Sequence, residues 1–188
     1  MIVNLPNILS ILRITLIPIF IAVFAAQSPG RSQWAALIFI MASLTDWFDG
    51  YIARRWEQVT LFGKFIDPVA DKLLVLAALI MLVEFKRVDS WIAIVIIGRD
   101  LAITGLRAIA SSMGIVIAAK EMGKYKTTVQ VVAISLLILD YPVFLFAKSI
   151  DLHYWGAVGI WLAAILSIIS ALEYFFKFWI QIKGQKLI

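Results

Sequence analysis

Long apolar segments separated by short polar connections run along the whole chain. Six of these segments are roughly 20 residues long, which is enough for an α-helix to cross the hydrocarbon core of a bilayer. We expect them at about residues 8–27, 33–54, 67–85, 91–112, 125–147 and 155–178. The pattern predicts an all-α integral membrane protein with six transmembrane helices, in a single domain over residues 1–188.

The composition agrees with this interpretation. The chain has 188 residues, of which 63% are hydrophobic, whereas a soluble domain is usually about 45–50% apolar. It has no cysteine, which excludes disulfides and thiolate metal sites. In so apolar a chain, a net charge of +5 indicates contact with anionic headgroups of a lipid bilayer or with an anionic substrate, and not with nucleic acid.

The basic residues between the apolar segments predict an orientation. Cytoplasmic connections of membrane proteins carry an excess of lysine and arginine. With the N-terminus inside, eleven basic residues fall on the cytoplasmic side: Arg13, Arg54, Arg55, Lys64, Arg107, Lys120, Lys124, Lys126, Lys177, Lys183 and Lys186. Only four fall on the other side: Arg31, Lys86, Arg87 and Lys148. The excess predicts that both termini are cytoplasmic.

Four of the twelve acidic residues gather in the second and third apolar segments. Asp46 and Asp49 are three residues apart, and Asp67 and Asp71 are four apart, so each pair lies on one face of its helix. Carboxylates at bilayer depth are costly. A single one could be a structural ion-pair partner or a proton-relay group, but four at this spacing indicate a chemical function.

The connection between the two acidic pairs is predicted to be a short polar turn from Arg54 to Gly63. Glycine is common in such turns, and Pro68 suits the first turn of the third helix, where its missing N–H is not needed. This turn would let the two helices run antiparallel. All four carboxylates would then meet at a similar depth, just inside the cytoplasmic interface.

The converging carboxylates predict a divalent metal site. Two carboxylates about 4 Å apart repel by roughly 4 kcal/mol at an effective dielectric constant near 20, so four of them need cations. Hard oxygen ligands without histidine or cysteine favour Mg²⁺, Mn²⁺ or Ca²⁺ over Zn²⁺. Gly50 and Ala53 remove side-chain bulk beside Asp49. We therefore expect a pair of Mg²⁺ ions and a pyrophosphate-bearing nucleotide across the second helix.

This acidic window resembles the signature of the CDP-alcohol phosphatidyltransferase family, in which eight positions are fixed over 26 residues. All eight are filled here: Asp46, Asp49, Gly50, Ala53, Arg54, Gly63, Asp67 and Asp71. Residues 4–13, 60–72, 105–107 and 123–130 further resemble the branch that makes phosphatidylglycerophosphate. Asp100 departs from that pattern, since glutamate usually follows the arginine there.

The resemblance implies a transfer of the phosphatidyl group from CDP-diacylglycerol to sn-glycerol 3-phosphate, releasing CMP. It implies that Asp46, Asp49, Asp67 and Asp71 hold two Mg²⁺ (or Mn²⁺) ions, and that Asp71 is also the catalytic base. The positions that would line the site for the CDP-lipid are Asp49, Gly50, Ala53, Arg54, Gly63 and Lys64. The family also implies a homodimer in the bacterial inner membrane, with its active site facing the cytoplasm.

Cationic residues in the fourth and fifth segments are candidates for binding the acceptor phosphate. Arg99 and Arg107 are eight residues apart and on nearly the same helix face, and Lys124 and Lys126 open the fifth segment. We expect Arg107, Lys124 and Lys126 to bind the phosphate, with Arg99 supporting them or paired to Asp100 or another aspartate. The alternative is that the lysines only contact lipid headgroups.

Two other functions are compatible with the pattern. The same fold and donor could serve another acceptor, namely an inositol phosphate, serine or phosphatidylglycerol. A cation transporter is the third hypothesis, but its polar residues should spread over the full depth of several helices. His153 is predicted to be an interfacial residue on the outer side.

Overall fold

The computed structural model describes residues 5–56, 61–113, 121–145 and 148–185. Within these ranges, the side chains of residues 5–7, 46–56, 61–68, 121–122, 124, 142–145, 148–150 and 184–185 are outside the description. The backbone forms six helices, as predicted: α1 (Leu5–Phe24), α2 (Pro29–Trp56), α3 (Leu61–Glu84), α4 (Ser90–Ser112), α5 (Glu121–Leu139) and α6 (Leu152–Gln185). A small antiparallel hairpin of β1 (Pro142–Leu145) and β2 (Lys148–Asp151) precedes α6.

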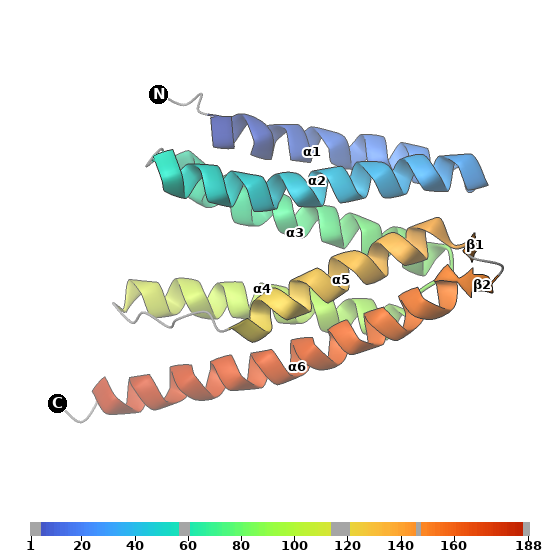
Figure 1. Ribbon diagram of the computed structural model, residues 1–188. Helices are drawn as coiled ribbons and strands as arrows, with labels where there is room; N and C mark the ends of the chain where they lie inside the picture. The colour runs from blue at the N-terminus through green and yellow to red at the C-terminus, as the bar shows by residue number, and fades with distance from the viewer. Residues whose placement is uncertain (1–4, 57–60, 114–120, 146–147, 186–188) are drawn as a thin grey trace.

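The helices form an elongated bundle (Figure 1). Helix α1 packs against α2 and α3, α6 packs against α4 and α5, and α2 joins the two groups by packing against α5. Helix α1 begins and α6 ends at the same end of the bundle, and the hairpin lies at the opposite end. We call these the terminal end and the hairpin end. Successive helices alternate in direction, so every odd-numbered helix begins at the terminal end.

The apolar core is largest in the half of the bundle near the hairpin end. Its fully buried side chains include Phe20, Phe24, Phe39, Leu79, Leu82, Ile134, Leu137 and Ile138. Helices α5 and α6 approach closely there because two glycines leave room. A Cβ atom on Gly159 would lie 2.8 Å from the Cβ of Ala133, and one on Gly156 would lie 2.7 Å from the Cγ of Leu137. These contacts fix α6 against α5.

The fifth helix is shorter than the sequence pattern predicts. It ends at Leu139, whereas we expected it to continue to residue 147. Asp140 adopts a left-handed backbone conformation (φ 47°), and the residue before Pro142 is disfavoured in a helix. The apolar residues that follow pair as a hairpin, so their hydropathy was mistaken for a continuing helix.

The predicted turn from Arg54 to Gly63 is also wrong in its bounds. Helix α2 continues to Trp56 and α3 already begins at Leu61, so Gly63 and Pro68 lie inside α3. Arginine is a good helix former and is favoured near a helix C-terminus, which explains the longer α2. A proline inside a membrane helix is tolerated where neighbouring groups satisfy the freed carbonyl.

Membrane-length apolar character is clearest in the last helix. Among the described residues, one helical segment is long and apolar enough to cross a membrane, and it is Leu152–Lys183 of α6. Shorter apolar stretches are Ile8–Phe24 and Tyr125–Leu139. Many large apolar side chains of α6 face outward, among them Trp161, Ile165, Leu172, Phe176 and Ile180. This outer surface is typical of a helix in contact with lipid.

Candidate functional site

The four aspartates lie on two helices that pack side by side. Asp46 and Asp49 are in the C-terminal half of α2, and Asp67 and Asp71 are in the N-terminal half of α3. Because α2 ends and α3 begins at the terminal end, both pairs lie in the terminal half of the bundle (Figure 1). The backbone therefore allows the predicted convergence of these carboxylates.

Of these four side chains, the structure describes only that of Asp71, which is half-buried. The side chains of Asp46, Asp49 and Asp67 lie outside the description, as do those of the nucleotide-site candidates Ala53, Arg54 and Lys64. No three acidic, histidine or cysteine side chains gather among the residues whose side chains are described. The metal site thus remains a prediction that rests on the sequence and on the placement of α2 and α3.

A polar cluster joins α4, α5 and α6, with Lys126 buried and Arg99 and Asp100 half-buried. The Nη1 atom of Arg99 lies 2.9 Å from Oδ1 of Asp100, so of the partners considered for Arg99 the structure shows Asp100. The Nζ atom of Lys126 on α5 donates to both carboxylate oxygens of Asp100, at 2.7 and 2.8 Å. The Nη2 atom of Arg99 donates to the hydroxyl of Ser170 on α6, at 2.8 Å.

Charged groups of both signs meet in this cluster. Lys126 is only 2% exposed, and such a buried ammonium group needs an anionic partner, which Asp100 supplies. Asp100 also contacts Arg99, so one carboxylate is shared by two cations. Asp71 on α3 lies close enough to Lys126 to act on it electrostatically. The structure therefore brings the predicted catalytic base near Lys126, one of the predicted acceptor-binding residues.

The other two acceptor candidates lie apart from this cluster or outside the description. Arg107 is two turns further along α4 and is exposed, with its guanidinium carbon 5.9 Å from the ring centre of Tyr174 on α6. The side chain of Lys124 is not described. The predicted acceptor cations thus form a buried inner group, Arg99 and Lys126, and an outer residue, Arg107.

Several buried polar atoms around this cluster find no hydrogen-bond partner among the described residues. They are Nε of Arg99, Oε1 of Gln130, Oγ of Ser167 and the hydroxyl of Tyr174. Gln130 lies one turn after Lys126 on α5, and Ser167 and Tyr174 lie on either side of Ser170 on α6. The sequence analysis missed them, although the spacing of Ser167, Ser170 and Tyr174 by three and four residues places them on one helix face.

The role of Arg13 was also not predicted from the sequence. It was counted as a basic residue of the cytoplasmic side, but its side chain is 1% exposed inside the bundle. Its Nε atom donates to the carbonyl of Ala42 on α2, at 3.1 Å. Ala42 is one turn before Asp46 on α2. Arg13 therefore places a buried positive charge about one helical turn from the pair Asp46 and Asp49, measured along the axis of α2.

A different charged cluster lies at the hairpin end. Nη1 of Arg87 donates to the carbonyls of Leu137 and Ile138 in the last turn of α5, at 2.9 and 2.8 Å, and its Nε lies 2.9 Å from Asp140. Burial lowers the pKa of Arg87, and the negative charge of Asp140 opposes this shift. Nδ1 of His153, predicted to be only interfacial, lies 2.6 Å from Oδ1 of Asp140.

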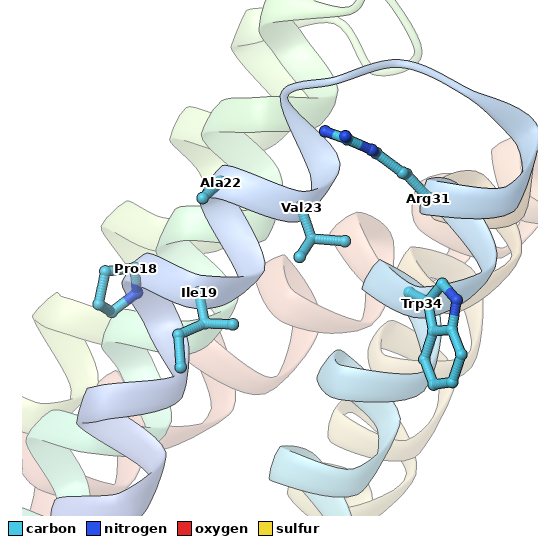
Figure 2. Close-up of a pocket in the computed structure, with 6 residues that line it drawn as sticks. All are labelled: Pro18, Ile19, Ala22, Val23, Arg31 and Trp34. Atoms are coloured by element: carbon cyan, nitrogen blue, oxygen red, sulfur yellow. The ribbon is translucent and has the colours of Figure 1, made fainter.

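A shallow groove of about 580 Å³ lies between α1 and α2 toward the hairpin end (Figure 2). It is lined by Pro18, Ile19, Ala22 and Val23 of α1 and by Arg31 and Trp34 of α2. The lining is almost entirely apolar and contains no carboxylate. This groove lacks the acidic residues that the predicted chemistry needs, so it is not a candidate for the reacting centre.

The comparison with known proteins decides the family. Residues 3–172 match the CDP-alcohol phosphatidyltransferases. The chain belongs to this family. It is 42% identical to a CDP-diacylglycerol–glycerol-3-phosphate 3-phosphatidyltransferase of Bacillus subtilis, over 96% of this chain and 97% of the relative. It is 41% identical to a protein of the same name from Rickettsia bellii (92% and 93% covered) and 40% identical to one from Haemophilus influenzae (91% of each).

Proposed function

We propose that this protein transfers the phosphatidyl group of CDP-diacylglycerol to sn-glycerol 3-phosphate, giving phosphatidylglycerophosphate and CMP. The observation that carries this proposal is the similarity over more than nine-tenths of the chain to relatives named for this activity. The cationic cluster beside Asp71 supports it, because a glycerol phosphate acceptor needs positive charge close to the group that takes its proton.

The donor site is formed by α2 and α3. Asp46, Asp49, Asp67 and Asp71 would hold two Mg²⁺ or Mn²⁺ ions, and this set of oxygen donors without histidine or cysteine fits such hard cations. When bound, the ions supply charge screening at the donor diphosphate and at the departing CMP. Asp49, Gly50, Ala53, Arg54 and Gly63 of the family signature line the cytidine diphosphate, together with the adjacent Lys64.

Asp71 acts as the general base. The acceptor hydroxyl has a high pKa and must lose its proton as its oxygen bonds to the β-phosphorus of the donor. The proton goes to the Asp71 carboxylate, the bond between the β-phosphorus and the CMP oxygen breaks, and CMP leaves. We favour a single in-line displacement, because no serine, cysteine or histidine occurs between Asp46 and Asp71 to form a phosphatidyl-enzyme.

The acceptor phosphate binds to the cations of α4 and α5. Arg99 and Lys126 both pair with Asp100, and Lys126 lies close enough to Asp71 for their charges to interact. Arg107 is exposed along the same helix and can meet the phosphate from the water side. Arginine suits this role because its planar fork of donors matches phosphate oxygens.

All six helices span the bacterial inner membrane, with both termini and the active site at the cytoplasmic face, and the protein forms a homodimer. This placement is supported by the alternating direction of the helices, by the outward apolar side chains of α6 and by the excess of basic residues at the terminal end. It puts the aspartates within reach of both a lipid headgroup and a water-soluble acceptor.

The test is CMP release by the purified protein in detergent or lipid nanodiscs. We expect release from CDP-diacylglycerol with sn-glycerol 3-phosphate and Mg²⁺, and none after chelation by EDTA. Parallel reactions with inositol phosphate, serine and phosphatidylglycerol distinguish the other acceptors. Release that is faster with one of these three, or that needs no divalent cation, would contradict the proposal.

A further inference from the structure

Helix α6 presents a buried polar face to the other helices. Ser167, Ser170 and Tyr174 are 0%, 7% and 8% exposed, and they lie on one face of the helix. Between residues 155 and 172 of α6, every residue other than Ser167 and Ser170 is apolar or glycine. A serine or tyrosine hydroxyl inside an apolar bundle is costly unless it is hydrogen-bonded. Three such groups on one face therefore suggest that α6 contributes to a polar site, and not only to packing.

Ser170 is the member of this face with defined partners on both sides. Its hydroxyl donates to the carbonyl of Ser167, at 3.1 Å, and accepts from Nη2 of Arg99, at 2.8 Å. A hydroxyl has one hydrogen to donate, so the bond to Ser167 leaves its lone pairs for Arg99. Ser170 thus presents a fixed acceptor to the guanidinium group.

The guanidinium of Arg99 is consequently held by two helices. Nη1 of Arg99 donates to Asp100, which lies on the same helix, α4, and Nη2 donates to Ser170, which lies on α6. Helix α6 is a firm support, because its close contacts with α5 at Gly156 and Gly159 set its position. The rotation of the guanidinium plane is therefore set by Ser170, since Asp100 alone would hold it at one nitrogen.

The Nε–H group of Arg99 remains a hydrogen-bond donor without an acceptor among the described residues. Nε of Arg99 is buried and has no partner among the described residues, and the same is true of Oε1 of Gln130 and the hydroxyl of Tyr174. Buried polar groups in native proteins are nearly always paired, so unpaired ones call for water or a ligand. This mixture of donors and acceptors suits a small molecule that carries both phosphate oxygens and hydroxyl groups.

We propose that Ser170 is a positioning residue that orients Arg99 for the anionic acceptor, so that α6 sets the affinity for that substrate. The inference rests on the proposed function, because it concerns the acceptor of the same reaction. It predicts that loss of the Ser170 hydroxyl weakens binding of sn-glycerol 3-phosphate and leaves binding of the CDP-lipid unchanged.

The experiment compares steady-state kinetics of the full-length protein with Ser170→Ala, Ser170→Cys and the control Ser135→Ala. Ser135 is equally buried, at 8% exposure, but its hydroxyl donates only to the carbonyl of Val131 in its own helix. Cysteine keeps the volume of serine and is a weak acceptor, so it tests the hydrogen bond without a cavity. KM does not depend on the fraction of active protein, so partial misfolding does not affect the comparison.

We expect both Ser170 variants to raise KM for sn-glycerol 3-phosphate about tenfold, the size expected for one lost hydrogen bond to a charged group. KM for CDP-diacylglycerol should change less than about twofold, and Ser135→Ala should match the wild type in both constants. An unchanged KM for the acceptor, or an equal rise for both substrates, would overturn the inference. Failure of the proposed function looks different, because the wild type itself would then release no CMP with this acceptor.

A double-mutant cycle separates positioning from direct contact. If Ser170 acts through Arg99, then Ser170→Ala should raise the acceptor KM less than twofold further in an Arg99→Lys background, which lacks the planar fork. A full tenfold rise in that background would show that Ser170 acts independently of Arg99, and it would overturn the positioning role.

Discussion

The two charged clusters of this bundle differ in how completely their polar atoms are paired. At the hairpin end, Arg87 uses its nitrogens on two carbonyls of α5 and on Asp140, and Asp140 also contacts His153. In the cluster that joins α4, α5 and α6, Arg99 is bound by Asp100 and Ser170. Its Nε, and further buried atoms on α5 and α6, have no partner among the described residues.

This difference indicates different roles. The hairpin-end cluster satisfies the last carbonyls of α5, which have no partner within the helix, and it fixes the connection between α3 and α4 against that helix end. It behaves as a completed structural contact. The cluster around Arg99 keeps buried polar atoms that have no partner among the described residues, as a binding site does before its ligand arrives.

The largest expected effect comes from Asp71. Asp71→Asn keeps the size of the side chain but removes the base, so turnover should fall about a hundred- to ten-thousand-fold. Binding of CDP-diacylglycerol should persist, because the other three aspartates remain. The measurement is CMP release together with binding of the CDP-lipid. Normal turnover in this variant would refute the assignment of the base.

Breaking the hairpin-end cluster should reduce stability and leave catalysis unchanged. Arg87→Met leaves two helix-end carbonyls and Asp140 without their cation, so the free energy of unfolding should fall by about 3 kcal/mol. Thermal unfolding in detergent measures this loss, and KM for both substrates should stay within about twofold of the wild type. A marked rise in the acceptor KM would contradict the separation of the two clusters.

The sequence predicted the helices well because hydropathy and length are local properties. In the part of the chain that the structure describes, the order and number of helices are as expected, and most bounds agree within a few residues. The errors arise where a local pattern has two interpretations. The apolar residues after Leu139 suit a strand as well as a helix, and only the backbone at Asp140 and Pro142 separates the two.

On α2 and α3 a long signature names each residue of the candidate site, and those assignments stay predictions because most of these side chains lie outside the description. On the other helices no such signature exists. Hydropathy does not show which face of a helix meets its neighbours. Ser170 and Tyr174 therefore went unnoticed on α6, and Arg13 was counted with the cytoplasmic cations although it is buried. The contact between Arg99 and Ser170 joins residues 71 positions apart, which no local pattern reveals.

Arg107 tests the outer part of the acceptor site. Arg107→Ala removes an exposed cation beside Tyr174, so KM for sn-glycerol 3-phosphate should rise about tenfold and far more than KM for CDP-diacylglycerol. Arg31→Ala is the matched control, since Arg31 is also an exposed arginine but lies at the hairpin end. Equal effects of the two variants would mean that only the total charge matters, and not the place of Arg107.

The smallest effect is expected from His153. Its ring contacts Asp140 but is 46% exposed, so His153→Ala should lower the free energy of unfolding by less than about 1 kcal/mol. Its backbone N–H still binds Asp151, which caps the start of α6. Asp151→Ala should therefore cost more, about 1 kcal/mol or above, since Asp151 also accepts from the N–H of Tyr154. An equal loss of unfolding free energy in His153→Ala and Arg87→Met would contradict this expectation. The histidine would then be an essential member of the hairpin-end cluster, because a peripheral contact cannot stabilise the fold as much as the arginine that binds the end of α5.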